Sequence, residues 1–258
     1  MKKISVFLAL LAFFFADAAL ARAVVMSLTG TAQAQAGTAA ARQLRLGDEV
    51  VQGDTVSTGP NSALGLRFDD GQVTALTQNS RMTITAYQYN EQAGTGNVLL
   101  SLLTGGMRAV TGLIGKNTPD RVTYRAANAT IGIRGTDVTI LTDGANVTVL
   151  VDKGEISFTY NGVTTKAQTI NVPAGFGVQA GPAFTFLNQI FAIGQIFSSL
   201  PPNLQTDMAV LRDVIDAVFR ASAGQSGTLN RGTFTPNTGS GASGGAGGGG
   251  TGTGPPSP

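Results

Sequence analysis

The chain has 258 residues, with no Cys, no His and no Trp, and only 12% of its residues are charged. This composition excludes a Ser/His/Asp triad, a Cys nucleophile, a disulfide and the zinc sites that are built from imidazole or thiolate ligands. Carboxylates, hydroxyls, Lys and Arg remain, so the one catalytic class left open is an enzyme that uses a pair of carboxylates. We expect no metal and no cofactor.

The N-terminal residues have the pattern of a secretory signal peptide. Residues 2–3 are Lys, residues 4–15 are apolar apart from one Ser, and small residues stand at −3 and −1 for a cut after Ala18, Ala21 or Ala23. Signal peptidase requires this combination. The apolar run is shorter than the ~20 residues that a membrane-spanning helix needs. We therefore expect cleavage rather than an uncleaved anchor, and we place the signal peptide at residues 1–23.

The charge of the mature chain points to no polyanionic partner. Removing residues 1–23 takes away three of the 17 basic residues and one of the 15 acidic residues, which leaves the mature chain formally neutral. Its remaining Lys and Arg residues are scattered, with no two in succession. A nucleic-acid site needs clustered basic residues, so nucleic-acid binding is not expected. No later apolar run is long enough to span a membrane.

Residues 24–182 have the pattern of an all-β domain. Apolar residues alternate with polar ones in several short runs, which is typical of half-buried strands. The clearest runs are Leu64/Leu66/Phe68, Met82/Ile84/Ala86 and Ile156/Phe158/Tyr160. The spacing of these runs predicts about a dozen strands, arranged as a β-solenoid-like or a rolled antiparallel β-domain.

Turn residues separate the expected strands. Asn, Asp and Gly tolerate the positive φ angles of tight hairpin turns. We expect two-residue hairpins at Asp70-Gly71, Asp143-Gly144 and Asn161-Gly162, a three-residue loop at Asp152-Lys153-Gly154, and further turns at Gly59-Pro60-Asn61-Ser62 and Lys116-Asn117-Thr118-Pro119.

Residues 183–221 change to the period of an α-helix. Two short amphipathic helices are expected, with apolar positions at Phe186, Leu187, Ile190, Phe191 and Phe197 in the first and at Leu204, Met208, Leu211, Ile215 and Val218 in the second. Asn203 is a candidate N-cap for the second helix. Their apolar faces would cover an open face of the β-domain, which is the favoured interpretation, or would form a docking surface. Residues 222–258 are rich in Gly, Ser and Pro, and they are expected to be a disordered tail.

The acidic clusters are best explained by turns. Asp69 and Asp70 lie at an expected hairpin tip, and Asp48 and Asp54 each follow a Gly. Asp48 and Asp54 are the weak candidates for a surface site that could hold a cation. Gly115-Lys116 lacks the remaining residues of a phosphate-binding loop.

The most unusual segment is Gly132-Ile133-Arg134-Gly135-Thr136, where an Arg stands between glycines inside an apolar run. Burial of a guanidinium is costly unless it is paired. We therefore expect Arg134 to turn inward at a bend and to donate to carbonyls or a carboxylate. Contact with a ligand is the alternative role.

Several segments resemble the FecR domain family in the family's own order, over about residues 30–179. They are Leu46–Asp48, Gly53–Gly59, Asn61–Gly71, Leu102–Arg108, Ala126–Val138, Val151–Ile156 and Val172–Gly175. The most specific element is Gly132-Ile133-Arg134-Gly135-Thr136. The resemblance implies a bacterial envelope protein with a solenoid-like or rolled β fold and no enzymatic activity. The family's regulators relay the state of an outer-membrane transporter to a sigma factor. The cytoplasmic, membrane-spanning and C-terminal signalling parts of those regulators have no counterpart here, so we expect a stand-alone exported FecR-domain protein.

Two classes of function follow. The first is a non-catalytic module, periplasmic or at the cell surface, that binds another envelope protein or a glycan; scaffolding is favoured over signalling. The second is a carboxylate-dependent polysaccharide hydrolase. Such an enzyme needs aromatic residues near an acidic pair, and Tyr87 and Tyr89 lie near no acidic pair in the sequence.

Overall fold

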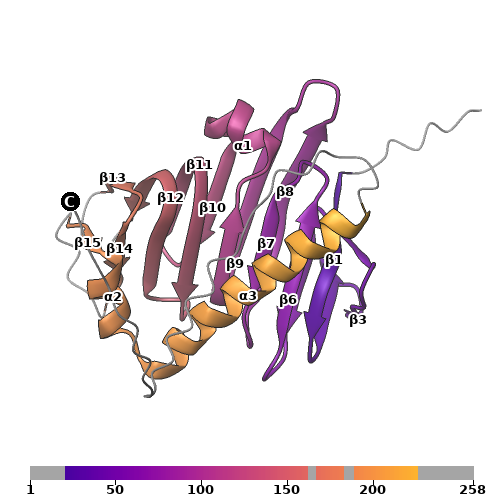
Figure 1. Cartoon of the computed structure of the whole chain (residues 1–258), viewed down its shortest axis with the longest axis horizontal. Coiled ribbons are helices and arrows are strands. Elements are labelled where there is room, and N and C mark those ends of the chain that lie inside the picture. The colour runs from indigo at the N-terminus through magenta and orange to yellow at the C-terminus, as the bar shows by residue number, and fades with distance from the viewer. Residues whose placement is uncertain (1–20, 162–166, 183–188, 226–258) are drawn as a thin grey trace, which may run out of the picture. The chain divides into compact units, whose positions relative to one another are not determined.

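A computed structural model describes residues 21–161, 167–182 and 189–225, and most of these residues lie in β-strands (Figure 1). The strands of the first half are β1 (Arg22–Thr29), β2 (Ala32–Ala36), β3 (Arg42–Gln43), β4 (Glu49–Val51), β5 (Asp54–Thr58), β6 (Ala63–Phe68), β7 (Val73–Leu76) and β8 (Arg81–Asn90). Those of the second half are β9 (Thr95–Val110), β10 (Val122–Ala126), β11 (Ala129–Thr142), β12 (Val147–Tyr160), β13 (Gln168–Pro173), β14 (Phe176–Ala180) and β15 (Phe191–Ala192). The helices are α1 (Leu113–Asn117), the 3₁₀-helix η1 (Pro119–Arg121), α2 (Ile193–Ser199) and α3 (Pro202–Gln225).

The strands form one sheet of 15 strands that rolls around a common core without closing. Neighbouring strands are antiparallel except for β9 and β10, which are parallel. The all-β prediction is therefore confirmed, in its rolled antiparallel form. Repeating solenoid coils are not seen in the described residues.

Three long strands, β9, β11 and β12, run through both sides of the rolled sheet, and the two halves of a strand pair with different neighbours. The first half of β9 pairs with β8 and β10, and its second half pairs with β7 and β11. Likewise, β12 pairs with β14 through its first half and with β13 through its second. Each long strand contains a glycine with positive φ between its halves: Gly105 (+91°), Gly135 (+59°) and Gly154 (+76°).

These bends keep the apolar side chains of both halves on the core. In β9 the core side chains occupy even positions up to Leu102 and odd positions from Met107 onward. In β11 the change is from Ile133 to Val138, and in β12 it is from Val151 to Ile156. Because side chains alternate along a strand, a half-strand that bent without this change of parity would turn its apolar face to solvent.

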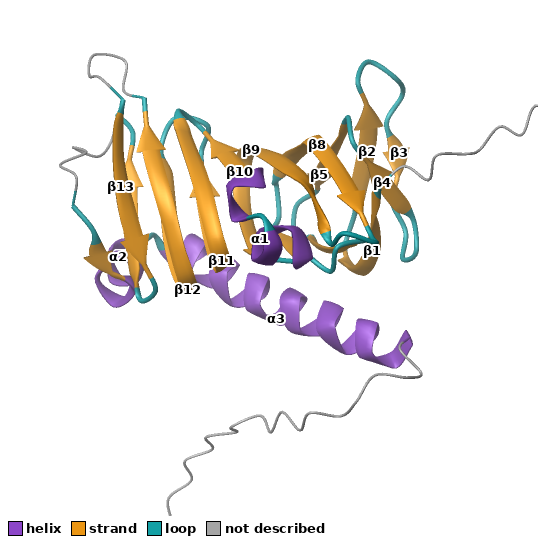
Figure 2. Cartoon of the chain, turned by 90° about the horizontal axis from the view of Figure 1, so that it is seen from above, coloured by secondary structure: helices purple, strands orange, loops and turns teal. Residues whose placement is uncertain are grey.

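Helix α3 covers the outer face of the sheet formed by β1, β6, β7 and the second half of β9 (Figures 1 and 2). Its buried face comprises Leu211, Val214, Ile215 and Val218, which pack on Ala63, Val73 and Ala75. Gly65 lets the helix approach, because a Cβ there would collide with Val218. The favoured interpretation of this apolar face, as a cover for the sheet, is confirmed.

The helical segment differs in length from the prediction. Helix α3 has 24 residues and begins at Pro202, so it is not short and Asn203 lies inside it rather than at its N-cap. Proline is favoured in the first turn of a helix because its missing N–H has no intrahelical partner there. Helix α2 has 7 residues and packs Ile196 on Leu141 and Leu150. No helix of the described residues is both long and apolar enough to cross a membrane.

Some expected turns are correct and others are wrong. The segments at Gly59–Ser62, Asp70-Gly71 and Asp143-Gly144 connect strands as predicted, but the last two belong to four-residue connections, Asp69–Gln72 and Asp143–Asn146, and are not two-residue hairpins. Asp152-Lys153-Gly154 is not a hairpin loop, because it forms the bend within β12.

Two further turn predictions differ from the structure. Tyr160 of β12 pairs with Gln168 of β13, so these strands are not joined by a two-residue hairpin at Asn161-Gly162. Residues 162–166 lie outside the described part of the chain. Residues 116–119 lie in α1 and η1, two helical turns within the domain that the strand pattern did not predict.

Secondary structure extends past the expected domain boundaries at both ends. Strand β1 begins at Arg22, before the boundary placed after Ala23, and α3 continues to Gln225, beyond residue 221. Most of the expected signal peptide, residues 1–20, and most of the expected tail, residues 226–258, lie outside the described residues. The domain division at these ends stays a prediction.

The bend at Gly154 gives the first testable prediction. A Cβ at Gly154 would lie 2.5 Å from the carbonyl oxygen of Gly135, and the φ of +76° disfavours any L side chain. Gly154→Ala should lower the free energy of unfolding by about 2 kcal/mol or more, measured by urea denaturation. Gly194→Ala in α2 is the matched control, because nothing lies within 4 Å of its Cβ position. The control should leave stability unchanged or raise it by up to about 1 kcal/mol. Equal effects of the two substitutions would contradict the role of the bend.

Candidate binding site beside helix α1

The signature segment 132–136 lies at the bend of β11 next to α1. Gly135 supplies the left-handed backbone of the bend, and Gly132 faces Ser157 of β12, where a Cβ would lie 2.6 Å from the Ser157 hydroxyl. Thr136 is buried directly after the bend. The glycines of the segment therefore serve the bend and the close contact between β11 and β12.

The expectation that Arg134 turns inward is wrong. Ile133 points into the core, so the alternation of the strand places Arg134 on the outside, and the bend comes only after it, at Gly135. The Arg134 side chain is exposed and makes no hydrogen bond or ion pair with another described residue.

The ion pair expected of Arg134 is made by Arg108 of β9 instead. Its Nε and Nη2 atoms donate to the two carboxylate oxygens of Asp137 at 2.8 and 2.9 Å, and Asp152 lies 3.5 Å away. The hydrogen bonds to Asp137 raise the pKa of Arg108 despite partial burial. In the sequence, Arg108 follows the paired glycines of β9, and Asp137 lies two residues after Gly135 of β11. Only the pairing of β9 with β11 brings these two charges together, so the ion pair was not predicted.

The segment that carries α1 is tied to the signature by Thr111 and Thr136. The N–H of Thr111 donates to the carbonyl oxygen of Thr136 at 3.0 Å, and the Thr111 hydroxyl donates to the same oxygen at 2.6 Å. In return, the N–H of Thr136 donates to the Thr111 hydroxyl at 2.8 Å. Both residues are buried, so these bonds hold the start of the α1 segment against the bend of β11.

On its other side, α1 is held by the buried Asp70 at the tip of the β6–β7 hairpin. The N–H of Leu113 donates to the Asp70 carbonyl at 2.8 Å, and the N–H of Ile114 donates to its carboxylate at 3.3 Å. The carboxylate also accepts from the N–H of Gln72 at 3.1 Å and from the Tyr87 hydroxyl at 3.3 Å. Burial raises the pKa of Asp70, and these hydrogen bonds act in the opposite direction. Burial and the nearby Asp70 also raise the pKa of Tyr87.

This network corrects the view that Tyr87 lies near no acidic pair. The hairpin folds back so that the Tyr87 hydroxyl also accepts from the Asp70 N–H at 3.0 Å. The turn interpretation of Asp69 and Asp70 is correct, but Asp70 has a second role as the anchor of α1. Sequence reasoning missed that role because α1 itself was not expected.

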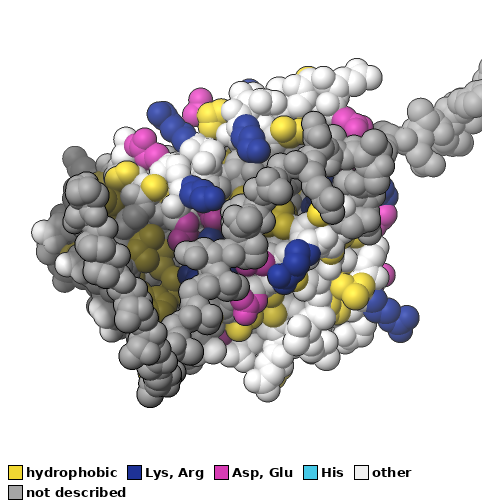
Figure 3. All heavy atoms as spheres, in the orientation of Figure 1, with side chains coloured by type: hydrophobic (Ala, Val, Ile, Leu, Met, Phe, Trp, Pro, Cys, Tyr) yellow, Lys and Arg dark blue, Asp and Glu magenta, His cyan; other side chains and the backbone are white. Residues whose placement is uncertain are grey.

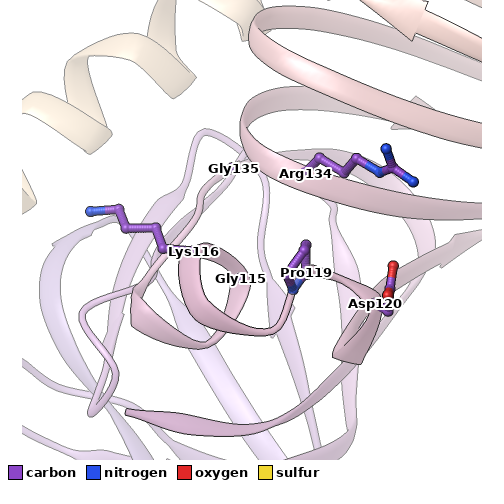
Figure 4. A pocket seen from close by; sticks show the side chains of 6 residues that line it. All are labelled: Gly115, Lys116, Pro119, Asp120, Arg134 and Gly135. Carbon is purple, nitrogen blue, oxygen red and sulfur yellow. The ribbon is translucent and has the colours of Figure 1, made fainter.

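Two hollows flank α1. The first, of about 480 Å³, is lined by Gly115, Lys116, Pro119, Asp120, Arg134 and Gly135. Figure 4 shows the Arg134 and Asp120 side chains extending on the same side, whereas Lys116 extends to the other side of α1. The second, of about 310 Å³, includes Lys116, Arg67, Asp69 and the half-exposed Leu113 and Phe219.

The weak candidates Asp48 and Asp54 do not form a surface site. Asp54 is only 2% exposed, and its carboxylate accepts from Arg42 at 2.7 Å and from the N–H of Val51 at 3.2 Å. The Asp48 carboxylate accepts from the N–H of Arg45 at 2.8 Å, as turn residues do. Within the described residues, no group of three or more acidic side chains is placed to hold a metal ion. On the face seen in Figure 3, basic and acidic side chains are interspersed.

Comparison with known proteins gives a family match in the centre of the chain. Residues 54–157 match the model of the family described as FecR protein, which confirms the resemblance over those residues. No curated protein matches the sequence.

Two crystal structures are similar in part. Both are of a protein assigned as an anti-sigma factor from Parabacteroides distasonis ATCC 8503, at 1.65 and 2.50 Å resolution. They are 12% and 11% identical to this chain, with TM-scores of 0.40 and 0.38. Each match covers 53% of this chain and 57% of that protein, so the chain spans little more than half of its length.

The burial of Asp70 predicts a dependence of stability on pH. A carboxyl whose pKa is raised by folding contributes its full stability below the unfolded value of about 3.9 and loses that contribution as the pH rises through the folded value. The free energy of unfolding of the wild type should therefore fall relative to that of Asp70→Asn as the pH rises from about 4 toward neutral. Urea denaturation at several pH values measures this difference. Asp120→Asn, at an exposed position, should follow the wild-type profile, and parallel profiles for Asp70→Asn and the wild type would contradict the prediction.

The link between Thr111 and Thr136 gives a further prediction. Thr111→Val removes the acceptor of the buried Thr136 N–H and should lower the free energy of unfolding by about 1–3 kcal/mol. Thr123→Val, at a half-buried position on the outer face of β10, is the control, and it should change stability by less than about 0.5 kcal/mol. Thermal or urea unfolding of both variants tests this, and a small effect at Thr111 would mean that the link is dispensable.

Proposed function

We propose that this chain, whose residues 54–157 form a FecR domain, is a non-catalytic binding module of the cell envelope or cell surface that serves cell-surface signalling or scaffolding. Its binding site is the first of the two hollows beside α1, the one lined by Arg134 and Asp120. Its partner is another envelope protein. The export of the chain rests on the signal-peptide pattern at its N-terminus.

The observation that carries this proposal is the exposed Arg134, whose side chain has no ion pair or hydrogen bond with any described residue. The half-buried Arg108 is paired with Asp137, and Arg42 with the buried Asp54. Arg134, by contrast, is presented at the rim of a hollow by a bend that hydrogen bonds hold in place. A guanidinium held in this way loses little freedom on binding and can form a bidentate pair with a carboxylate.

The charges of the hollow favour a protein partner. Asp120 lines the same hollow as Arg134 and extends on the same side (Figure 4). Lys116 lines the hollow as well, so its charges are two cations and one anion. Such a hollow complements a protein surface of mixed charge, because complementary potentials give a protein interface its specificity.

The acidic residues give less support to the polysaccharide hydrolase. Such an enzyme needs two carboxyl groups that face each other across a cleft. Asp54 is buried against Arg42, Asp48 is bound to its own turn, and Asp70 is buried among backbone N–H groups. These contacts use the carboxylates for structure, so we favour the binding module.

The role of Arg134 is tested by substitution. Arg134→Ala should weaken binding of an envelope protein by about 10- to 100-fold, because an interface Arg of this kind commonly accounts for that much affinity. The measurement is quantitative recovery of bound proteins from envelope extracts, followed by titration with the purified partner.

Arg45→Ala is the matched control, because Arg45 is also exposed but lies between β3 and β4, outside both hollows. The control should bind as the wild type does, and both variants should unfold at the wild-type temperature. The proposal fails if Arg134→Ala and the wild type recover the same proteins equally, or if only a glycan is bound.

A further inference from the structure

The start of β1 shows which N-terminal residues a complete domain needs. Ala23 is fully buried in the core and pairs with Val50 on one side and with Phe68 on the other. Arg22 is the first residue of the strand and pairs with Val51. A mature chain that began at Val24 would lack both residues.

The backbone nitrogen of Arg22 lies against a carboxylate. It donates to Oδ2 of Asp69 at 2.8 Å, and the Asp69 N–H donates back to the Arg22 carbonyl at 3.1 Å. The Arg22 guanidinium forms an ion pair with Glu49, and its Nε lies 3.9 Å from Asp69. Two acidic side chains therefore surround this one residue, on the turn after β6 and on β4.

We propose that signal peptidase cleaves the Ala21–Arg22 bond and that the new α-ammonium group of Arg22 pairs with the Asp69 carboxylate. Water hydrolyses the amide, the Ala21 carboxylate leaves with the signal peptide, and the nitrogen stays on Arg22 as an ammonium ion. The inference rests on the export that the proposed function assumes. Ala19 and Ala21 supply the small residues at −3 and −1.

The two other sequence-compatible cuts give poorer products. A cut after Ala23 would remove the Arg22 ion pair with Glu49, the bond to Asp69 and a buried residue of the core. A cut after Ala18 would keep Ala21, which is partly buried against the core, but would place the ammonium three residues away from Asp69. The peptidase acts before the domain folds, so the fold does not direct the cut. It decides which product has a complete β1 with its terminal charge paired.

Mass spectrometry and N-terminal sequencing of the full-length chain expressed in a secreting bacterial host test the cut. We expect a mature protein that begins at Arg22. A protein that begins at Ala19 or Val24 would overturn this inference and leave the proposed binding function standing. A chain that still begins at Met1 would overturn this inference, and its recovery in the cytoplasmic fraction would also overturn the export on which the proposed function depends.

The ammonium–carboxylate pair is tested by the position of the new terminus. A mature chain that begins at Arg22 should unfold about 2 °C higher than one that begins at Ala21, because one added residue moves the ammonium away from Asp69. Asp69→Asn in both forms should abolish this difference. A difference of the same size in the Asp69→Asn pair, or no difference in the wild-type pair, would overturn the assignment of Asp69.

Discussion

The roll depends on one geometric constraint, which is that each long strand must bend and still keep its apolar side chains on the core. Strict alternation would carry the second half of a bent strand out to solvent. Positive-φ glycines at 105, 135 and 154 introduce the change of parity that prevents this. The bends of β11 and β12 lie against each other. They are so close that a Cβ at Gly154 would collide with the backbone of residues 134 and 135. These glycines therefore determine the path of the strands.

The same bends also shape the proposed binding site. The alternation of β11 points Arg134 outward just before the bend at Gly135, where it lies at the rim of a hollow. The residue after it, Thr136, is buried and holds Thr111. Asp70 then holds the other side of α1 through Leu113 and Ile114. Residues from three separate parts of the segment that matches the FecR family thus meet around a helix of 5 residues. The same contacts support the fold and position the residues of the proposed site.

The placement of charges follows from the same pairing of strands. Arg108 and Asp137 are 29 residues apart and meet because β9 and β11 are neighbours after their bends. Arg42 and Asp54 meet inside the β2–β5 region in the same way. A guanidinium whose partner is supplied by a neighbouring strand cannot be recognised from local sequence, and this is why Arg134, flanked by glycines, was the more conspicuous candidate for an internal ion pair.

The sequence by itself determined the all-β class, the alternating core positions, several hairpin turns and the FecR segment, because these depend on side-chain period and on the φ preferences of Gly, Asn and Asp. It also marked the signature glycines as a bend. Only the tertiary structure decided that Gly154 bends a strand instead of closing a hairpin, that Arg134 faces solvent while Arg108 is paired, and that Asp70 anchors α1. Each of these depends on contacts between residues far apart in the chain, and the free energy of such contacts is set by burial and partner geometry that no local pattern contains.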